Sequence, residues 1–163
     1  MKQQNIHWII EECGKNHLGI AQIAYILGTV EHETARTFEP VREAFWRTEL
    51  WRKDNLRYFP YYGRGFVQLT WKVNYLAYSH ILGLVGTPDD LVTNPDVALS
   101  VPVATFILVH GFKKGTFTGK AIGSYISQDN KNIDFINARQ VINGLDRAKD
   151  IARLAQLWYA KLK

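Results

Sequence analysis

The sequence predicts a mainly α protein with one small irregular or β element, and three observations indicate this fold class. Apolar residues recur at helical spacing across residues 20–30, with so little polar surface that the predicted helix is largely buried. Two further apolar stretches, residues 97–109 and 146–162, predict helices in the second half of the chain. Residues 58–70 differ, because aromatic residues, two glycines and a short β-prone run predict an irregular or hairpin-like segment.

Proline and aspartate residues mark the ends of other predicted elements. Pro40 is expected to open a second helix, since proline is favoured in a first turn where its missing N–H is no loss. Helical character returns at residues 71–84, and Pro102 is expected to kink or restart the helix of residues 97–109. Asp146 is the expected N-cap of the last helix.

The composition predicts one globular domain that is stabilised by packing. The chain has 163 residues, of which 47% are hydrophobic and 21% are charged, and it shows no internal repeat. This length is sufficient for one core, so we expect a single domain over residues 1–163. Cys13 is the only cysteine, which excludes an intrachain disulfide and a multi-cysteine zinc site.

The charge predicts attraction to polyanions but does not choose among them. Twenty Lys and Arg residues against fifteen Asp and Glu residues leave a net charge of +5, which suits nucleic acid, anionic membranes and an acidic cell wall equally. The basic residues are scattered and form no run typical of a nucleic-acid-binding arm. Residues 1–10 do not form a signal-peptide core, and no apolar run approaches the ~20 residues of a membrane-spanning helix. We therefore expect synthesis in the cytoplasm, no nucleic-acid partner and no stable membrane insertion.

The predicted buried helix ends in three titratable residues, Glu31-His32-Glu33. A carboxylate at the C-terminal end of a helix lies against the negative end of the helix dipole, and a neighbouring acid also opposes its ionisation. Both effects favour the protonated form that a general acid needs near neutral pH. The alternative interpretation is a pair of solvated acids, and helical phase does not decide between Glu31 and Glu33.

Glycosidic cleavage needs a second carboxylate, and the nearby candidates are Glu39, Glu43 and Glu49. A continuous helix from Glu33 to Glu43 would separate them by ~15 Å, whereas an inverting pair is roughly 6.5–9.5 Å apart. A bend is therefore required, and Pro40 marks the expected place. The alternative is a surface helix on which Glu39, Glu43 and Arg47 are neighbours one turn apart.

Residues 61–70, Tyr-Tyr-Gly-Arg-Gly-Phe-Val-Gln-Leu-Thr, are the most specific stretch of the sequence. The glycines permit close backbone approach, the tyrosines have flat apolar faces with a polar tip, and Gln68 and Thr70 offer neutral donors and acceptors. Sugars combine apolar ring faces with hydroxyl groups, so this mixture suits a carbohydrate. Aromatic and glycine-rich loops also stack on nucleic-acid bases, so composition alone leaves both ligands open.

Three ordered motifs resemble family 19 glycoside hydrolases, which include plant chitinases and many bacteriophage endolysins. The motifs are His32-Glu33-Thr34, residues 61–70 continuing to Asn74-Tyr75, and Ile142-Asn143-Gly144. The resemblance spans roughly residues 20–157 and implies a lysozyme-like, mainly α fold. The chain departs from the family pattern where glycine or proline is usual, at Ala35-Arg36, Phe66 and Leu145.

The resemblance implies a role for each residue at a matching position. Glu33 is the expected general acid, Glu43 the expected general base, and Thr70 the residue that orients the attacking water. The expected sugar-binding residues are Tyr62, Gln68, Asn74 and Asn143, and the expected supporting residues are His32, Arg64 and Arg139. No metal and no cofactor is implied. The loop that carries Glu43 varies in the family, so Glu39 stays open as the base.

The small size, the missing signal peptide and the single cysteine resemble a phage endolysin more than a secreted plant chitinase. The resemblance then implies a monomeric muramidase-type enzyme that inverts the anomeric centre of peptidoglycan and has no separate wall-binding domain. It would reach the periplasm and cell wall through a holin pore and lyse the host. Two alternatives stay open, namely a chitinase acting on N-acetylglucosamine polymers and a non-catalytic wall-binding relative.

Overall fold

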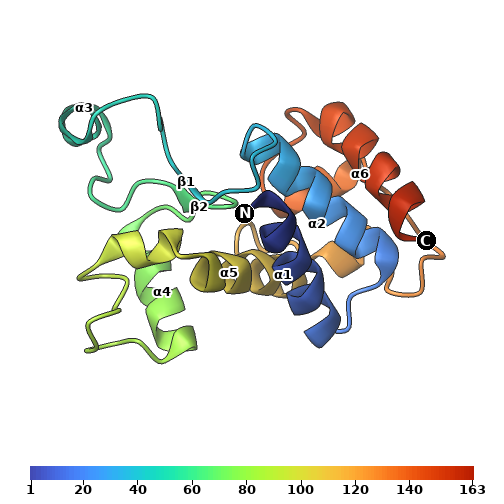
Figure 1. The fold of residues 1–163 in the computed structure, drawn as a ribbon, viewed down its shortest axis with the longest axis horizontal. Coiled ribbons are helices and arrows are strands. Elements are labelled where there is room, and N and C mark those ends of the chain that lie inside the picture. The colour runs from blue at the N-terminus through green and yellow to red at the C-terminus, as the bar shows by residue number, and fades with distance from the viewer. The chain divides into compact units, whose positions relative to one another are not determined.

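The computed structural model describes residues 1–163 and confirms the mainly α fold class (Figure 1). The α-helices are α1 (Lys2–Lys15), α2 (Ile20–Glu33), α3 (Glu49–Asn55), α4 (Lys72–Leu82), α5 (Val101–Lys114) and α6 (Ala148–Leu162). The strands β1 (Val41–Arg42) and β2 (Arg64–Gly65) pair antiparallel. Three short 3-10 helices complete the chain, η1 (Pro95–Leu99), η2 (Ile122–Ser124) and η3 (Asn137–Val141). None of these helices combines enough length with enough apolar character to span a bilayer.

The chain groups into two compact units. The first unit comprises residues 1–38 and 105–163, and the second comprises residues 39–104. Helix α5 begins in the second unit and continues into the first. The single catalytic domain expected over residues 1–163 stays a prediction.

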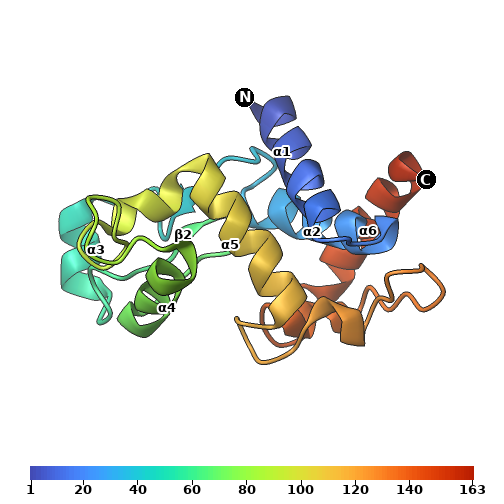
Figure 2. The ribbon, with the colours of Figure 1, turned by 90° about the horizontal axis from the view of Figure 1, so that it is seen from below.

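Helix α2 is the buried centre of the first unit, as its apolar spacing predicts. Every residue from Ala21 to Val30 except Ile23 is buried. Helix α6 packs along α2, and the two helices are neighbours in both views (Figure 1, Figure 2). Its buried face is formed by Ala148, Ile151, Ala152 and Ala155. The first unit is therefore organised around one helix pair.

Gly28 sets how closely α2 and α6 approach. A Cβ atom placed on Gly28 would lie 2.9 Å from the backbone nitrogen of Ala155 and 3.4 Å from the carbonyl oxygen of Ile151. Because these contacts are to backbone atoms, a side-chain rotation cannot relieve them. Glycine at this position therefore permits the close packing of the helix pair.

Helix α2 ends at Glu33, and the chain bends before Pro40 as a base at Glu43 requires. Ala35, Arg36 and Phe38 have φ angles of 50°, 70° and 56°. A right-handed helix cannot continue through backbone with positive φ. Residues 33–43 therefore do not form the continuous helix that would separate Glu33 from Glu43 by ~15 Å.

The helix predicted at Pro40 is wrong. Residues Val41–Arg42 form β1, the next four residues form a turn, and α3 begins only at Glu49, where the Thr48 hydroxyl oxygen caps the Trp51 N–H at 3.1 Å. The reason is the pairing of β1 with β2, which joins segments more than twenty residues apart. The helix-starting preference of Pro40 is a local property and gives no information about a strand pairing with a distant segment.

The remaining element predictions differ from the structure at their boundaries. Pro102 lies in the first turn of α5, where it needs no hydrogen-bond acceptor, and residues before it form η1. Arg147, with φ of 61°, occupies the N-cap of α6 in place of Asp146. The hairpin-like segment predicted within residues 58–70 is confirmed by the antiparallel bridge between Arg64 and Leu69.

The Gly28→Ala variant should lower the free energy of unfolding by about 1–3 kcal/mol, because the added methyl group overpacks the crossing of α2 and α6. Urea denaturation followed by circular dichroism measures this change. Gly14→Ala is the matched control, since Gly14 is an exposed residue of α1 with no atom near its added Cβ, and alanine favours helix. Equal stabilities of the two variants would contradict the packing account.

Candidate active site

The candidate acid and the candidate base belong to different units. Glu33 is the last residue of α2 in the first unit, and Glu43 follows β1 in the second unit. Each carboxylate has hydrogen-bond partners within its own unit. Each carboxylate is therefore oriented by contacts within its own unit.

Arg139 orients the carboxylate of Glu33. Its Nη1 lies 3.1 Å from Oε1 of Glu33, and its Nε donates to the carbonyl oxygen of Asp146 at 2.8 Å. The Arg139 side chain is 5% exposed and the Glu33 side chain 24% exposed. A buried guanidinium with two fixed acceptors holds one carboxylate oxygen in place. The second oxygen, Oε2, is not part of this ion pair.

The structure separates the roles of Glu31 and Glu33, which helical phase left open. The indole Nε1 of Trp158 on α6 donates to Oε2 of Glu31 at 2.8 Å. Glu31 therefore joins α2 to α6, while Glu33 pairs with Arg139. His32 lines a hollow of about 350 Å³ together with Glu31 and neighbouring charged residues, and Glu33 is not among the lining residues.

Asn143 lies in the loop between η3 and α6 and is exposed. Its Oδ1 accepts a hydrogen bond from the Gly144 N–H at 2.9 Å, and its own N–H donates to the carbonyl of Arg139 at 3.0 Å. Arg139 also holds the carbonyl of Asp146, so the arginine that orients Glu33 fixes this loop as well.

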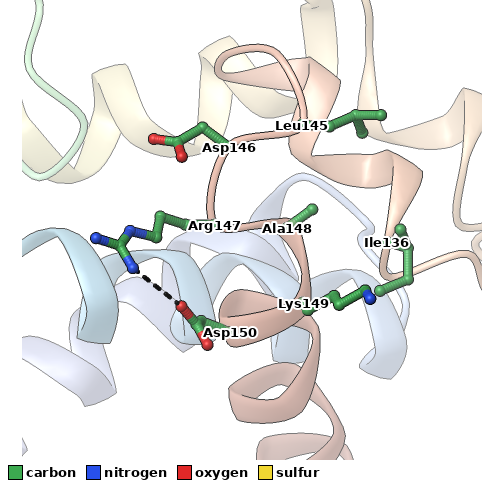
Figure 3. A pocket seen from close by; sticks show the side chains of 7 residues that line it. All are labelled: Ile136, Leu145, Asp146, Arg147, Ala148, Lys149 and Asp150. Carbon is green, nitrogen blue, oxygen red and sulfur yellow. Dashed lines mark ion pairs between the residues drawn. The ribbon is translucent and has the colours of Figure 1, made fainter.

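The same loop borders a hollow of about 430 Å³ in the first unit (Figure 3). Leu145 and Ile136 supply apolar lining, and both side chains are exposed. Arg147 points towards Asp150, with 3.7 Å between Nη1 and Oδ2 (Figure 3). Leu145 makes this part of the loop apolar.

Both carboxylate oxygens of Glu43 accept hydrogen bonds. The Tyr58 hydroxyl donates to Oε1 at 2.5 Å, and the Gly63 N–H donates to Oε2 at 2.8 Å. The buried Arg52 holds the surrounding turn by donating to the carbonyls of Glu43 at 2.9 Å and Ala44 at 3.1 Å. These bonds fix the direction of the carboxylate, and each oxygen keeps a further lone pair for a water molecule.

Tyr58 is a partner of the candidate base that the sequence did not indicate. Burial raises the pKa of Tyr58 to about 12, and the hydrogen bond and charge of Glu43 act in the same direction. The phenol therefore stays protonated, and remains a donor, throughout the neutral range. The centroid of its ring lies 4.9 Å from that of the Trp71 ring. The guanidinium of Arg57 lies over the Trp71 ring, 5.4 Å from its centroid. The aromatic richness of residues 58–62 was the only sequence signal for this contact.

Thr70 is arranged to accept a hydrogen bond from water. Its hydroxyl donates to the carbonyl of Gln68 at 2.8 Å, which leaves the lone pairs of Oγ1 available. The Asn74 Nδ2 in turn donates to the Thr70 carbonyl at 2.8 Å, and Asn74 is exposed. The Gln68 Nε2 donates to the carbonyl of Val41 at 3.0 Å, so this amide holds β1 beside the 61–70 segment.

Tyr62 is buried against charged side chains of the second unit and exposes no ring face, and its sugar-binding role stays a prediction. It is fully buried, and Arg64 lies 3.8 Å from its ring centroid while Arg52 lies 5.3 Å away. Its hydroxyl oxygen is 3.0 Å from Oε2 of Glu49 and 3.0 Å from Nη1 of Arg42. The cations compete with a ligand for the ring because they are attracted to its π-face.

Arg64 is a buried residue of the second unit whose guanidinium has several hydrogen-bond partners. Its guanidinium donates to Oδ1 of Asp96 at 2.9 Å, to the Pro60 carbonyl at 2.7 Å and to the Tyr75 hydroxyl at 3.0 Å. Arg42 pairs with both oxygens of Asp96, at 2.9 and 3.2 Å. Burial opposes ionisation of Asp96, but the hydrogen bonds and charges of the two guanidinium groups outweigh it and hold the pKa of that carboxyl below its usual value.

No group of three or more His, Cys, Asp or Glu side chains in the structure is placed to hold a metal ion. The two candidate carboxylates are instead surrounded by hydrogen-bond donors, Arg139 at Glu33 and Tyr58 with Gly63 at Glu43. These donors orient the two carboxylates, and oriented carboxylates can serve as positioned general acids and bases.

The second unit should lose stability in acid through Asp96. Its folded-state pKa lies below the ordinary value of 3.8, so its stabilising contribution is complete above that pH and is lost as the pH falls towards the lower folded value. Asp96→Asn should therefore be less stable at pH 7 and show a smaller decrease between pH 5 and pH 2, measured by urea unfolding. Asp89→Asn, on an exposed turn, should retain the wild-type acid dependence.

Comparison with known proteins gives a short match, and no family model matches the chain. The chain is 53% identical over 47 residues to a protein described as Chitinase 11 from Oryza sativa subsp. japonica. The match covers 29% of this chain and 16% of the rice protein. A chitinase-like stretch, together with a mainly α fold, therefore supports a relation to glycoside hydrolases at a coarse level.

Proposed function

We propose that this protein hydrolyses glycosidic bonds in a cell-wall glycan, with Glu33 as the proton donor and Glu43 as the base. The observation that carries this proposal is the presence of two oriented carboxylates, Glu33 at the end of α2 and Glu43 directly after β1. Arg139 holds one, and Tyr58 with the Gly63 amide holds the other. The chitinase-like stretch is consistent with this chemistry.

The proposed reaction is a single displacement with inversion. Glu33 donates a proton to the glycosidic oxygen as the bond to the anomeric carbon breaks. A water molecule attacks that carbon and gives a proton to Glu43, while Thr70 accepts a hydrogen bond from the same water. Arg139 stabilises the carboxylate that remains on Glu33 after the proton leaves, because the guanidinium already lies 3.1 Å away. Both carboxylates must flank one bond for this scheme to operate.

We infer that the glycan is peptidoglycan and that the protein acts as a monomeric endolysin of muramidase type. The net charge of +5 would favour approach to an anionic envelope. In this proposal the protein reaches the wall through a holin pore and lyses the host cell. Chitin is the second candidate substrate, because the matched rice protein is described as a chitinase.

Replacing the proposed acid tests the function. Glu33→Gln should clear suspensions of purified peptidoglycan about 10²- to 10⁴-fold more slowly, since general acid catalysis contributes that much to the rate. Glu31→Gln is the matched control, because Glu31 is bonded to Trp158 on α6, and it should keep activity near wild type. Circular dichroism establishes that both variants are folded. Wild-type turnover in Glu33→Gln would refute the assignment.

The same assay locates the base and the substrate. Glu43→Gln should lose activity while Glu39→Gln retains it, and the reverse result would assign the base to Glu39.

Parallel digestion of chitin and peptidoglycan distinguishes a chitinase from a peptidoglycan hydrolase, because a chitinase would release soluble oligosaccharides from chitin and none from peptidoglycan. A non-catalytic wall-binding protein would sediment with peptidoglycan and release no reducing ends from either polymer.

A further inference from the structure

The Tyr58 hydroxyl is the side-chain donor to the proposed base. Its oxygen lies 2.5 Å from Oε1 of Glu43, at the short end of the range for a hydroxyl bonded to a carboxylate. The other donor to this carboxylate is the Gly63 backbone N–H at 2.8 Å. Tyr58 is therefore the partner of Glu43 that a side-chain substitution can remove.

The position of Tyr58 is fixed from two directions. Its ring lies 4.9 Å from the ring of Trp71, and its carbonyl accepts the Tyr61 N–H at 2.8 Å. The Trp71 N–H donates to the carbonyl of Tyr61 at 2.8 Å. Backbone hydrogen bonds through Tyr61 therefore connect Tyr58 with Trp71. Trp71 also directly follows Thr70, the proposed water-binding residue. Tyr58, which donates to the proposed base, and Thr70, the proposed water-binding residue, are thus both held by the segment that contains Tyr61 and Trp71.

From this geometry we propose that Tyr58 is a positioning residue that holds the Glu43 carboxylate in the direction needed to accept a proton from water. This inference rests on the function proposed above. A short hydrogen bond from a fixed hydroxyl donor orients the carboxylate oxygen that accepts it. Because burial keeps the phenol protonated, Tyr58 donates this bond over the whole working range of pH.

Tyr58→Phe removes the hydroxyl and keeps the ring that contacts Trp71. Loss of one hydrogen bond to a charged group should lower kcat about 10- to 100-fold, with KM changed less than about twofold because Tyr58 acts through Glu43. Circular dichroism establishes that the variant is folded, so that a lower kcat reports lost turnover.

Tyr61→Phe is the matched control. The Tyr61 hydroxyl donates to the carbonyl of Val92 at 2.9 Å, so this variant also removes one tyrosine hydrogen bond from the same segment. Its kcat should equal that of the wild type. A double variant, Tyr58→Phe with Glu43→Gln, should lose no more than about twofold beyond Glu43→Gln alone, because both changes act on one proton transfer.

Two results would overturn the inference alone, and a third would overturn the proposed function with it. A Tyr58→Phe enzyme with the kcat of the wild type would remove the role of Tyr58 and leave Glu33 and Glu43 in place. A full additional loss in the double variant would have the same meaning. A wild-type protein that releases no reducing ends from any glycan would overturn the proposed function and this inference together.

Discussion

The close approach of α2 and α6 at Gly28 is the constraint on which the first unit depends. Helix α2 is buried over most of its length, and its contact with Ala155 leaves no space for a side chain at the crossing. Trp158, three residues further along α6, binds Glu31 at the end of α2. The packing of the two helices therefore supports the end of α2, where Glu33 pairs with Arg139.

The second unit achieves order by different means. Its only sheet is a pair of two-residue strands, and its interior contains a guanidinium, Arg64, bonded to Asp96 and Tyr75. The Arg64 side chain is 4% exposed, so removing Asp96 would leave a buried guanidinium without its charged partner, which is destabilising. The segment from Gly63 to Thr70 is thereby held in one conformation, and this segment supplies the Gly63 N–H to Glu43. Fold and candidate site use the same residues here.

Features that depend on neighbours along one helix could be predicted from the sequence, whereas those that depend on pairing across the chain could not. Burial of α2 follows from its apolar period, and its end at Glu33 agrees with the motif at that point. The helix expected at Pro40 is absent because β1 pairs with a distant strand. Tyr62 lies in a segment that suits a sugar, yet Arg64 lies over its ring. Tyr58 is one of several aromatic residues in that segment, and its contact with Glu43 depends on pairing across the chain that the sequence does not show.

Chemical analysis of the products tests the central claim most directly. Wild-type protein would be incubated with purified peptidoglycan, the new reducing ends reduced with borohydride, and the fragments identified by mass spectrometry. The account predicts new N-acetylmuramic acid ends, formed by wild-type protein and not by Glu33→Gln. Release of peptides or sugars without any new reducing end would contradict glycosidic hydrolysis by this pair of carboxylates.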